Sequence, residues 1–281
     1  MTDKLRTDET WAAAHEAERA KLAETGMYRL EDERDSCGVG LVVAIDGKPR
    51  RQVVKSGIAA LKAIWHRGAV DADGKTGDGA GIHVQIPKAF FDDQIRRTGH
   101  EPQEGERIAI GMIFLPRTDF GAQETCRAII ETEVLRMGHY IYGWRQVPVD
   151  ISCLGEKANA TRPEIEQIII ANRKGLDEES FERELYVVRR RAEKAAAAAN
   201  IAGFYLCSLS CRSVIYKGMM LAEQVSTFYP DLDDPRFESA FAIYHQRYST
   251  NTFPQWWLAQ PFRMLAHNGE INTLKGNRNW M

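Results

Sequence analysis

Apolar and polar positions divide the chain into a polar leader and a longer part with strand and helix patterns. Residues 8–24 are rich in charge and alanine, with few large apolar side chains, and predict a helix ended by Gly26. At Cys37 the pattern changes abruptly to a continuous apolar run over residues 38–45. We therefore predict a boundary between Ser36 and Cys37.

The apolar run is partly β-branched and is closed by Asp46-Gly47. It predicts a strand buried on both faces and followed by a tight turn, with Cys37 at the start of a central strand. Apolar residues then recur at helical spacing and predict an amphipathic helix that ends at His66-Arg67-Gly68. These residues are Val54, Ile58, Leu61 and Trp65.

Further apolar segments predict more strands, with helices between several of them. The strand candidates are residues 80–86, 107–115, 139–147, 165–171, 203–216, as a bent strand or a hairpin, and 237–248. The clearest helix is 177–199, whose acidic start and basic later turns complement the helix dipole. Because the pattern lacks a regular βαβ alternation, it favours antiparallel sheets layered with helices over a doubly wound fold.

Composition narrows the class of protein. The 281 residues, 44% hydrophobic and 27% charged, suffice for a large core in one big domain or two small ones. A net charge of -2 gives no indication of a nucleic-acid or membrane surface. Five scattered cysteines favour a reducing, cytoplasmic setting. We find neither an apolar run of membrane-spanning length nor an apolar signal core, which argues against secretion.

Residues 68–76 superficially resemble a phosphate-binding loop. Five residues separate Gly68 from Gly74, where that motif needs four, and the segment follows a predicted helix instead of a strand. The spacing of Asp71, Asp73 and Asp78 does not fit a calcium loop. A glycine-rich turn is the better interpretation.

Cys207 and Cys211 lie four residues apart in an apolar segment and would share one face of a regular strand. A zinc site would need two more ligands, and no histidine has a partner at ligand spacing. We therefore interpret both as buried core cysteines.

The C-terminal part contains polar residues that a core does not require. Arg247 is followed by hydroxyl residues at Ser249 and Thr250, a combination that suits a carboxylate ligand. The pair Asn268-Gly269 suits an oxyanion, because the amide side chain and the glycine N–H can both donate. Each feature alone has a structural alternative, namely a surface ion pair for Arg247 and a hairpin turn for Asn268-Gly269.

Taken together, five motifs resemble the class II glutamine amidotransferases, which belong to the N-terminal nucleophile hydrolases. The motifs occur in the family's order, and the resemblance spans the whole chain. They are Cys37-Gly-Val-Gly, His66-Arg67-Gly68-Ala69, Gly77-Asp-Gly-Ala-Gly-Ile82, Arg247-Tyr-Ser-Thr250 and His267-Asn268-Gly269-Glu270-Ile271-Asn272-Thr273.

Within the family, the closest resemblance is to the large subunit of the bacterial, NADPH-dependent members that join the released ammonia to 2-oxoglutarate. It rests on the leader that ends in Asp35-Ser36, on residues 252–262 and on the ending at 275–281. The electron donor stays open, because ferredoxin-dependent relatives share this region.

The resemblance implies an α+β fold, a four-layer αββα sandwich with two antiparallel sheets between helical layers. It implies that residues 1–36 are a propeptide and that residues 37–281 form a glutaminase domain truncated at its C-terminus. Removal of the propeptide would free the α-amino group of Cys37 to act as general base.

The resemblance also implies a role for each matching residue. Cys37 would attack the glutamine amide, Asn268 and the N–H of Gly269 would hold the oxyanion, and Arg247 would bind the substrate α-carboxylate. Pocket-lining positions would be Arg67, Ser249 and Thr250.

In the full family enzyme, ammonia passes to a downstream synthase domain of the same polypeptide and reacts with 2-oxoglutarate. That step uses FMN, a 3Fe-4S cluster and a small partner subunit carrying FAD and NADPH. We expect no cofactor and no metal in the present segment. We also expect it to stop before the acidic residue that binds the substrate amino group, and to be inactive alone.

Two alternatives remain. In class II amidotransferases that transfer ammonia to a sugar phosphate or to aspartate, the cysteine directly follows the initiator methionine, so the leader argues against them. A non-catalytic domain kept for assembly or regulation should have lost a site residue, yet Cys37, Arg247, Asn268 and Gly269 are all present.

Overall fold

The computed structural model describes residues 9–26, 38–247 and 253–264. The chain divides into two compact units, residues 1–36 and 37–281. The first unit contains helix α1 (Glu9–Thr25), which confirms the helix predicted for the leader. The side chains of α1 that the structure describes are all exposed, in keeping with its polar sequence.

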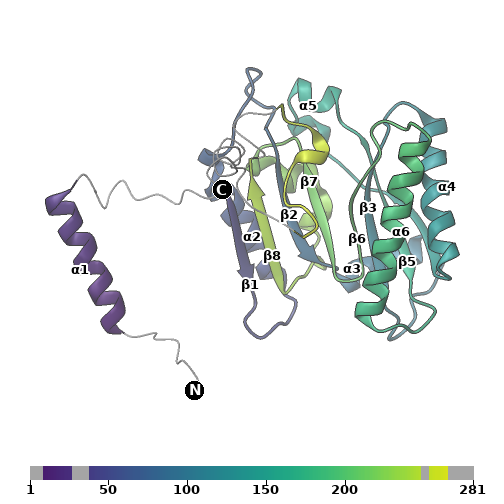
Figure 1. Cartoon of the computed structure of the whole chain (residues 1–281), viewed down its shortest axis with the longest axis horizontal. Coiled ribbons are helices and arrows are strands. Elements are labelled where there is room, and N and C mark those ends of the chain that lie inside the picture. Colours follow the sequence, from purple (N-terminus) through teal and green to yellow (C-terminus); the bar gives the residue numbers. More distant parts are fainter. Residues whose placement is uncertain (1–8, 27–37, 248–252, 265–281) are drawn as a thin grey trace, which may run out of the picture. The chain divides into compact units, whose positions relative to one another are not determined.

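The strands of the second unit form two four-stranded antiparallel sheets (Figure 1). The first has the order β1-β8-β2-β7 and the second β4-β5-β3-β6. The bounds are β1 (Val39–Val43), β2 (Ala80–Gln85), β3 (Ile108–Leu115), β4 (Tyr140–Gln146), β5 (Glu164–Ala171), β6 (Tyr205–Ser210), β7 (Ser213–Gly218) and β8 (Phe241–Gln246).

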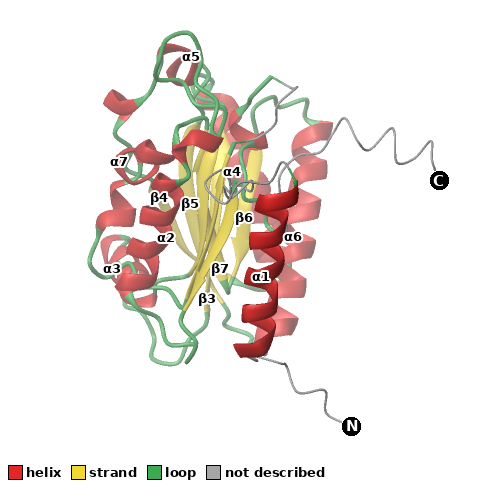
Figure 2. Cartoon of the chain, turned by 90° about the vertical axis from the view of Figure 1, so that its left-hand side faces the viewer, coloured by secondary structure: helices red, strands yellow, loops and turns green. Residues whose placement is uncertain are grey.

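Helices lie on both sides of the strands, with α2, α3 and α7 on one side and α6 on the other (Figure 2). This arrangement confirms the predicted α+β class, with two antiparallel sheets between helices. The α-helices are α2 (Arg51–Ala63), α3 (Lys88–Arg97), α4 (Phe120–Arg136), α5 (Glu156–Ala160), α6 (Glu178–Ala198) and α7 (Val225–Phe228). The 3₁₀ turns are η2 (Trp65–Arg67), η3 (Ile151–Cys153), η4 (Ala222–Gln224), η5 (Pro230–Asp233) and η6 (Trp256–Leu258).

Helix α2 covers one face of the first sheet. Its approach is close because Gly57 carries no side chain, and a Cβ there would lie 2.7 Å from the Cβ of Ala242. On the other face, Leu41 is 60% and Val43 is 55% exposed, and in the described part of the chain β1 is an edge strand. Among the described residues, the prediction that this strand is buried on both faces is therefore wrong, because an apolar run alone does not say which faces are covered.

Helices α4 and α6 pack on one face of the second sheet. Alternate residues of β3 point to opposite sides, so that Ala109 and Ile113 join the core under these helices while Ile110 joins the core beside α2. Helix α6 confirms the helix predicted over 177–199. Asp177 caps it by accepting a hydrogen bond from the Ser180 N–H at 2.8 Å.

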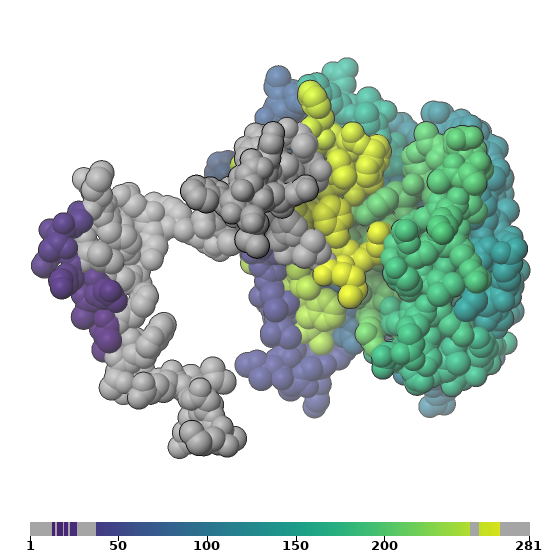
Figure 3. Space-filling view, in the orientation of Figure 1, coloured from purple at the N-terminus to yellow at the C-terminus, as the bar shows by residue number. Residues whose placement is uncertain are grey.

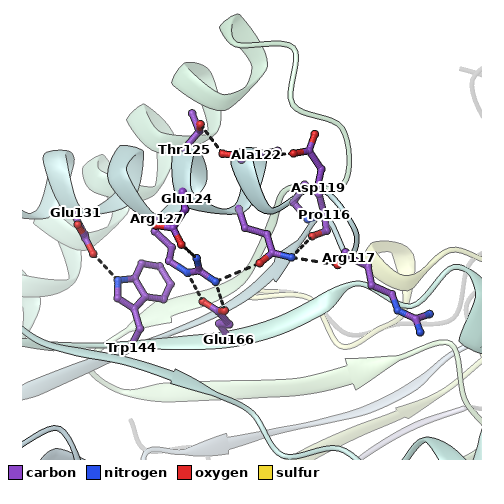
Figure 4. A network of polar contacts seen from close by, with 12 residues as sticks. Pro116, Arg117, Asp119, Ala122, Glu124, Thr125, Arg127, Glu131, Trp144 and Glu166 are labelled. Atoms are coloured by element: carbon purple, nitrogen blue, oxygen red, sulfur yellow. Dashed lines mark hydrogen bonds and ion pairs between the residues drawn. The ribbon is translucent and has the colours of Figure 1, made fainter.

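A network of polar contacts fastens α4 to the second sheet (Figure 4). The Trp144 indole of β4 donates to Glu131 at 2.7 Å, and Arg127 donates through Nε to Glu166 of β5 at 2.8 Å. Gln123 donates to the Pro116 carbonyl after β3 at 2.7 Å. One helix is thus tied to two strands and to the segment that directly follows a third.

A buried cluster joins the two sheets. Arg145 of β4 forms a bidentate pair with Asp231, with N–O distances of 2.7 and 2.9 Å. The Tyr216 hydroxyl of β7 donates to Asp231 at 2.9 Å and accepts from Gln167 of β5 at 3.0 Å. Because burial makes loss of either charge costly, this cluster fixes the position of one sheet against the other.

The segment predicted over 203–216 forms a hairpin whose strands belong to different sheets. Cys207 lies in β6 and is buried, which confirms its interpretation as a core cysteine. Cys211 lies in the turn after β6 and is only half-buried, so the prediction that both share one strand face is wrong. The strand ends at Ser210, and the alternation of side chains ends with it.

Two other boundaries differ from the sequence prediction. Helix α2 ends at Ala63, and Trp65 in the following 3₁₀ turn is 66% exposed although its spacing predicted a buried position. Helical spacing no longer applies after the last helical residue. Strand β8 begins at Phe241, because the segment before it only bridges to Arg50 at Ser239.

Residues 253–264, yellow in Figure 3, lie against the first sheet near α6. The Trp256 indole is buried and donates to the Ala158 carbonyl at 3.0 Å. The buried ammonium of Lys217 donates to the Trp257 carbonyl at 2.9 Å and lies 4.7 Å from the ring centroid of Phe262. This segment is thus fixed by an indole and a buried cation.

Burial lowers the pKa of Lys217 from 10.5 to about 8, against the opposing effect of Cys207 and with a smaller contribution from the nearby Arg263 cation. Between these two pKa values the unfolded chain binds more protons than the folded chain, so the free energy of unfolding rises with pH in this window. From pH 7.5 to 9.5 we expect wild-type protein to gain about 2 kcal/mol more stability than Lys217→Met. Urea unfolding at the two pH values measures this difference.

Lys62→Met, at an exposed position of α2, is the control and should follow the wild-type pH dependence. Equal pH dependence of wild type and Lys217→Met would show that the ammonium keeps its ordinary pKa.

Candidate active site

Three chain segments that are distant in sequence meet at one end of the first sheet. Strand β8 runs antiparallel to both β1 and β2, so the end of β8 adjoins the starts of its two neighbours. The Gln246 N–H donates to the Gly38 carbonyl at 2.6 Å, and the Arg247 N–H donates to the Gly79 carbonyl at 2.8 Å. Gly38, the residue after Cys37, and Arg247, the arginine predicted to bind a carboxylate, therefore lie at the same end of the first sheet.

Arg247 has an unusual backbone. Its φ of 79° lies in the left-handed region, which non-glycine residues rarely adopt and which costs of order 1 kcal/mol or more. The side chain is 35% exposed, and its Nε lies 3.6 Å from Oδ2 of Asp78. Its hydrogen bond to Gly79 and this ion pair hold Arg247 at the point where β8 ends.

Asp78 connects Arg247 to the turn that carries Arg67. Its side chain is buried, and Oδ1 accepts a hydrogen bond from the Ala69 N–H at 3.1 Å. The Asp78 N–H in turn donates to the Ala69 carbonyl at 3.2 Å. The same turn packs on β8, because a Cβ on Gly68 would lie 1.8 Å from the side-chain nitrogen of Gln246. Arg67 and Arg247 therefore lie on two segments that share one buried carboxylate.

The loop between this turn and β2 is a small hairpin, bridged between Val70 and Gly77. Hydrogen bonds from Thr76 lower the pKa of Asp73, and a bond from Lys157 lowers the pKa of Asp71. The loop is thus a glycine-rich turn, as predicted, in which these carboxylates have separate protein partners.

The structure describes two of the predicted site residues, Arg67 and Arg247, and brings their segments together. The other predicted residues lie outside the described part of the chain, although Gly38 directly follows one of them, Cys37. These residues are Cys37, Ser249, Thr250, Asn268 and Gly269.

Sequence reasoning missed the roles of Asp78 and Gln246. In the sequence, Asp78 belongs to an acidic stretch and to a glycine-rich motif. The signal was a single acidic residue between Gly77 and Gly79, directly before a strand. Its importance depends on the pairing of that strand with β8, which sequence alone does not state.

The described residues do not fit an iron–sulfur cluster. Among residues 9–26, 38–247 and 253–264, no three His, Cys, Asp or Glu side chains gather in a way that could hold a metal ion. The four cysteines of these ranges are free thiols, namely Cys126, Cys153, Cys207 and Cys211. No helix in the same ranges is long and apolar enough to cross a membrane.

Residues 37–281 match the family model described as glutamine amidotransferases class-II. The chain is 64% identical to the glutamate synthase [NADPH] large chain of Azospirillum brasilense over 281 residues, which is 100% of this chain and 18% of the relative. It is 44% identical to the protein of the same name from Bacillus subtilis over 261 residues, 91% of this chain and 17% of the relative.

A third relative is the chloroplastic ferredoxin-dependent glutamate synthase of Spinacia oleracea. It is 43% identical over 259 residues, which is 91% of this chain and 16% of the relative. The chain therefore spans less than a fifth of the length of each of these relatives.

The hairpin packs closely on the loop after β7. A Cβ on Gly77 would lie 2.3 Å from the carbonyl carbon of Met220 and 2.5 Å from the nitrogen of Leu221, both backbone atoms. We expect Gly77→Ala to lower the free energy of unfolding by about 1–3 kcal/mol, because two backbones must separate. Urea unfolding measures this loss.

Gly121→Ala in α4 is the control, since its Cβ would meet only Asp119 Oδ1 at 3.5 Å. Alanine also favours a helix, so this variant should be as stable as wild type or more so. If Gly77→Ala were equally stable, the hairpin would not be held by this contact.

Proposed function

The chain belongs to the class-II glutamine amidotransferases, and we propose that it is the glutaminase part of a glutamate synthase. The observation that carries this proposal is that Gly38, bonded to Gln246, and Arg247, bonded to Gly79, lie at the same end of the first sheet. It supports a site in which Cys37, the residue before Gly38, reacts with a substrate whose carboxylate pairs with Arg247. The family match, which begins at Cys37, supports the same assignment.

In the proposed reaction, the Cys37 thiolate attacks the carbon of the glutamine side-chain amide. The C–S bond forms and the carbonyl oxygen becomes an oxyanion, which accepts hydrogen bonds from Asn268 and from the N–H of Gly269. The C–N bond then breaks and ammonia leaves with the proton taken from the thiol. Water hydrolyses the thioester, which releases glutamate and restores the thiol.

The proton of the thiol needs an acceptor near neutral pH. An α-amino group titrates at about 7.7–8.0, so a usable fraction is unprotonated at neutral pH. Cys37 has such a group only after cleavage behind Ser36. We therefore propose that residues 1–36, which form a unit of their own, are a propeptide.

Substrate binding is assigned to Arg247, with Arg67, Ser249 and Thr250 lining the pocket. The Nε side of the Arg247 guanidinium faces Asp78. The two terminal nitrogens are then the donors for the α-carboxylate of glutamine, in the forked geometry that guanidinium groups favour.

In the intact enzyme, we propose that ammonia passes to a synthase domain of the same polypeptide and that 2-oxoglutarate accepts it. FMN, a 3Fe-4S cluster and a small subunit with FAD and NADPH would supply electrons there, in a cytoplasmic setting. Both NADPH-dependent and ferredoxin-dependent relatives match this chain, so either electron donor is compatible with it.

We expect diazo-oxonorleucine, an electrophilic glutamine analogue, to label the processed wild-type enzyme at Cys37 and to leave Cys37→Ala unlabelled. The reason is that only an activated thiol in a glutamine site meets this electrophile. Mass spectrometry of the labelled enzyme measures the result.

Cys153→Ala is the matched control, because burial raises the pKa of the half-buried Cys153 and keeps its thiol protonated. This control should be labelled like wild type. Labelling that survives Cys37→Ala would remove Cys37 from the mechanism, and a wild-type enzyme that is never labelled would favour a non-catalytic domain.

Processing has a separate test. We expect the intact mass and N-terminal sequence of the enzyme from its native host to place the mature N-terminus at Cys37. A mature chain that starts at Met1 or Thr2 would refute the propeptide. Ser36→Pro should slow the cleavage, because proline removes the adjacent N–H and restricts the backbone.

A further inference from the structure

We propose that Asp78 is a positioning residue for glutamine binding, which holds the guanidinium of Arg247 against the 65–69 turn before the substrate arrives. This inference rests on the proposed function, since it assumes that Arg247 receives the α-carboxylate. It concerns a residue with no assigned role in the reaction described above.

The two oxygens of the Asp78 carboxylate contact different segments. Oδ1 accepts the hydrogen bond from Ala69 at 3.1 Å, and Oδ2 lies 3.6 Å from Nε of Arg247. The side chain is only 7% exposed. A buried carboxylate is stable only while charged or hydrogen-bonding partners offset its lost hydration, so the turn and Arg247 stabilise the same group.

Arg247 is held from two directions by consecutive residues. Its N–H donates to the Gly79 carbonyl at 2.8 Å, and its side chain pairs with Asp78. The first contact supports the left-handed backbone, and the second limits the rotamers of the long side chain. A mobile arginine loses about 1.5–2 kcal/mol of side-chain entropy when it is ordered. If Asp78 has already ordered Arg247, less of this cost falls on substrate binding.

The same hairpin offers a matched control. Asp71 forms an ion pair with Lys157 at 2.7 Å. The Asp71 side chain is more exposed than that of Asp78, and the Lys157 side chain is more exposed than that of Arg247. Asp71 lies in the hairpin loop beyond the Val70–Gly77 bridge, whereas Asp78 lies on the other side of this bridge. An exposed pair contributes little, so its loss should not affect the substrate.

The test measures glutaminase kinetics of the intact, processed enzyme. Asp78→Asn keeps an acceptor for Ala69 but removes the charge that faces Arg247. We expect the KM for glutamine to rise about tenfold or more, with kcat changed less than about threefold, because binding and not the chemical step is affected. Asp71→Asn should leave both parameters unchanged.

A substrate analogue without the α-carboxylate, 4-aminobutanamide, separates positioning from a general structural role. Its kcat/KM should be equal in wild type and Asp78→Asn, because it makes no use of Arg247. Equal losses on glutamine and on the analogue would overturn the inference, as would an unchanged KM for glutamine. If Asp78→Asn fails to fold, Asp78→Glu replaces it, and its KM should rise with kcat retained.

Arg247→Ala distinguishes this inference from the proposed function. If it leaves the KM for glutamine unchanged, the proposed role of Arg247 fails, and the role of Asp78 fails with it. If Arg247→Ala raises KM while Asp78→Asn does not, only the inference about Asp78 is overturned.

Discussion

Strand β8 pairs with β1 on one side and with β2 on the other, and the candidate site depends on this pairing. The antiparallel register places the end of β8 beside the starts of its two neighbours. A slip of one residue would turn Arg247 to the opposite face and would separate it from Asp78. Among the residues that the structure describes, the hydrogen bonds from Gln246 to Gly38 and from Arg247 to Gly79 are the last contacts of this register.

The rest of the fold keeps this end of the first sheet in place. Helix α2 closes over one face of the first sheet at Gly57, and the cluster of Arg145, Asp231 and Tyr216 ties that sheet to the second one. The hairpin before β2 packs on the loop after β7, where a Cβ on Gly77 would meet backbone atoms of Met220 and Leu221. Segments near the site thus contact other layers, so its geometry is a property of the whole unit.

Arg247 combines an ion pair with a left-handed backbone conformation. A non-glycine residue with positive φ is costly, and such residues are found where the surroundings hold them in place. Here the surroundings are a backbone carbonyl and a buried carboxylate that adjoin each other in sequence. In the proposed site, an arginine that is already held in place favours binding, because the guanidinium and the substrate carboxylate both lose hydration when they pair.

The sequence by itself determined the classes of element and the candidate chemistry. The acidic start and basic later turns of residues 177–199 predict α6, and the polar run that contains Arg247 marks a candidate ligand site, because local patterns carry this information. Only the tertiary structure decided that the apolar run of β1 is half-exposed, that 203–216 divides between two sheets, and that Asp78 meets Arg247. These facts depend on which distant strands pair and which faces are covered, and no local pattern of side chains contains the register between strands so far apart in the chain.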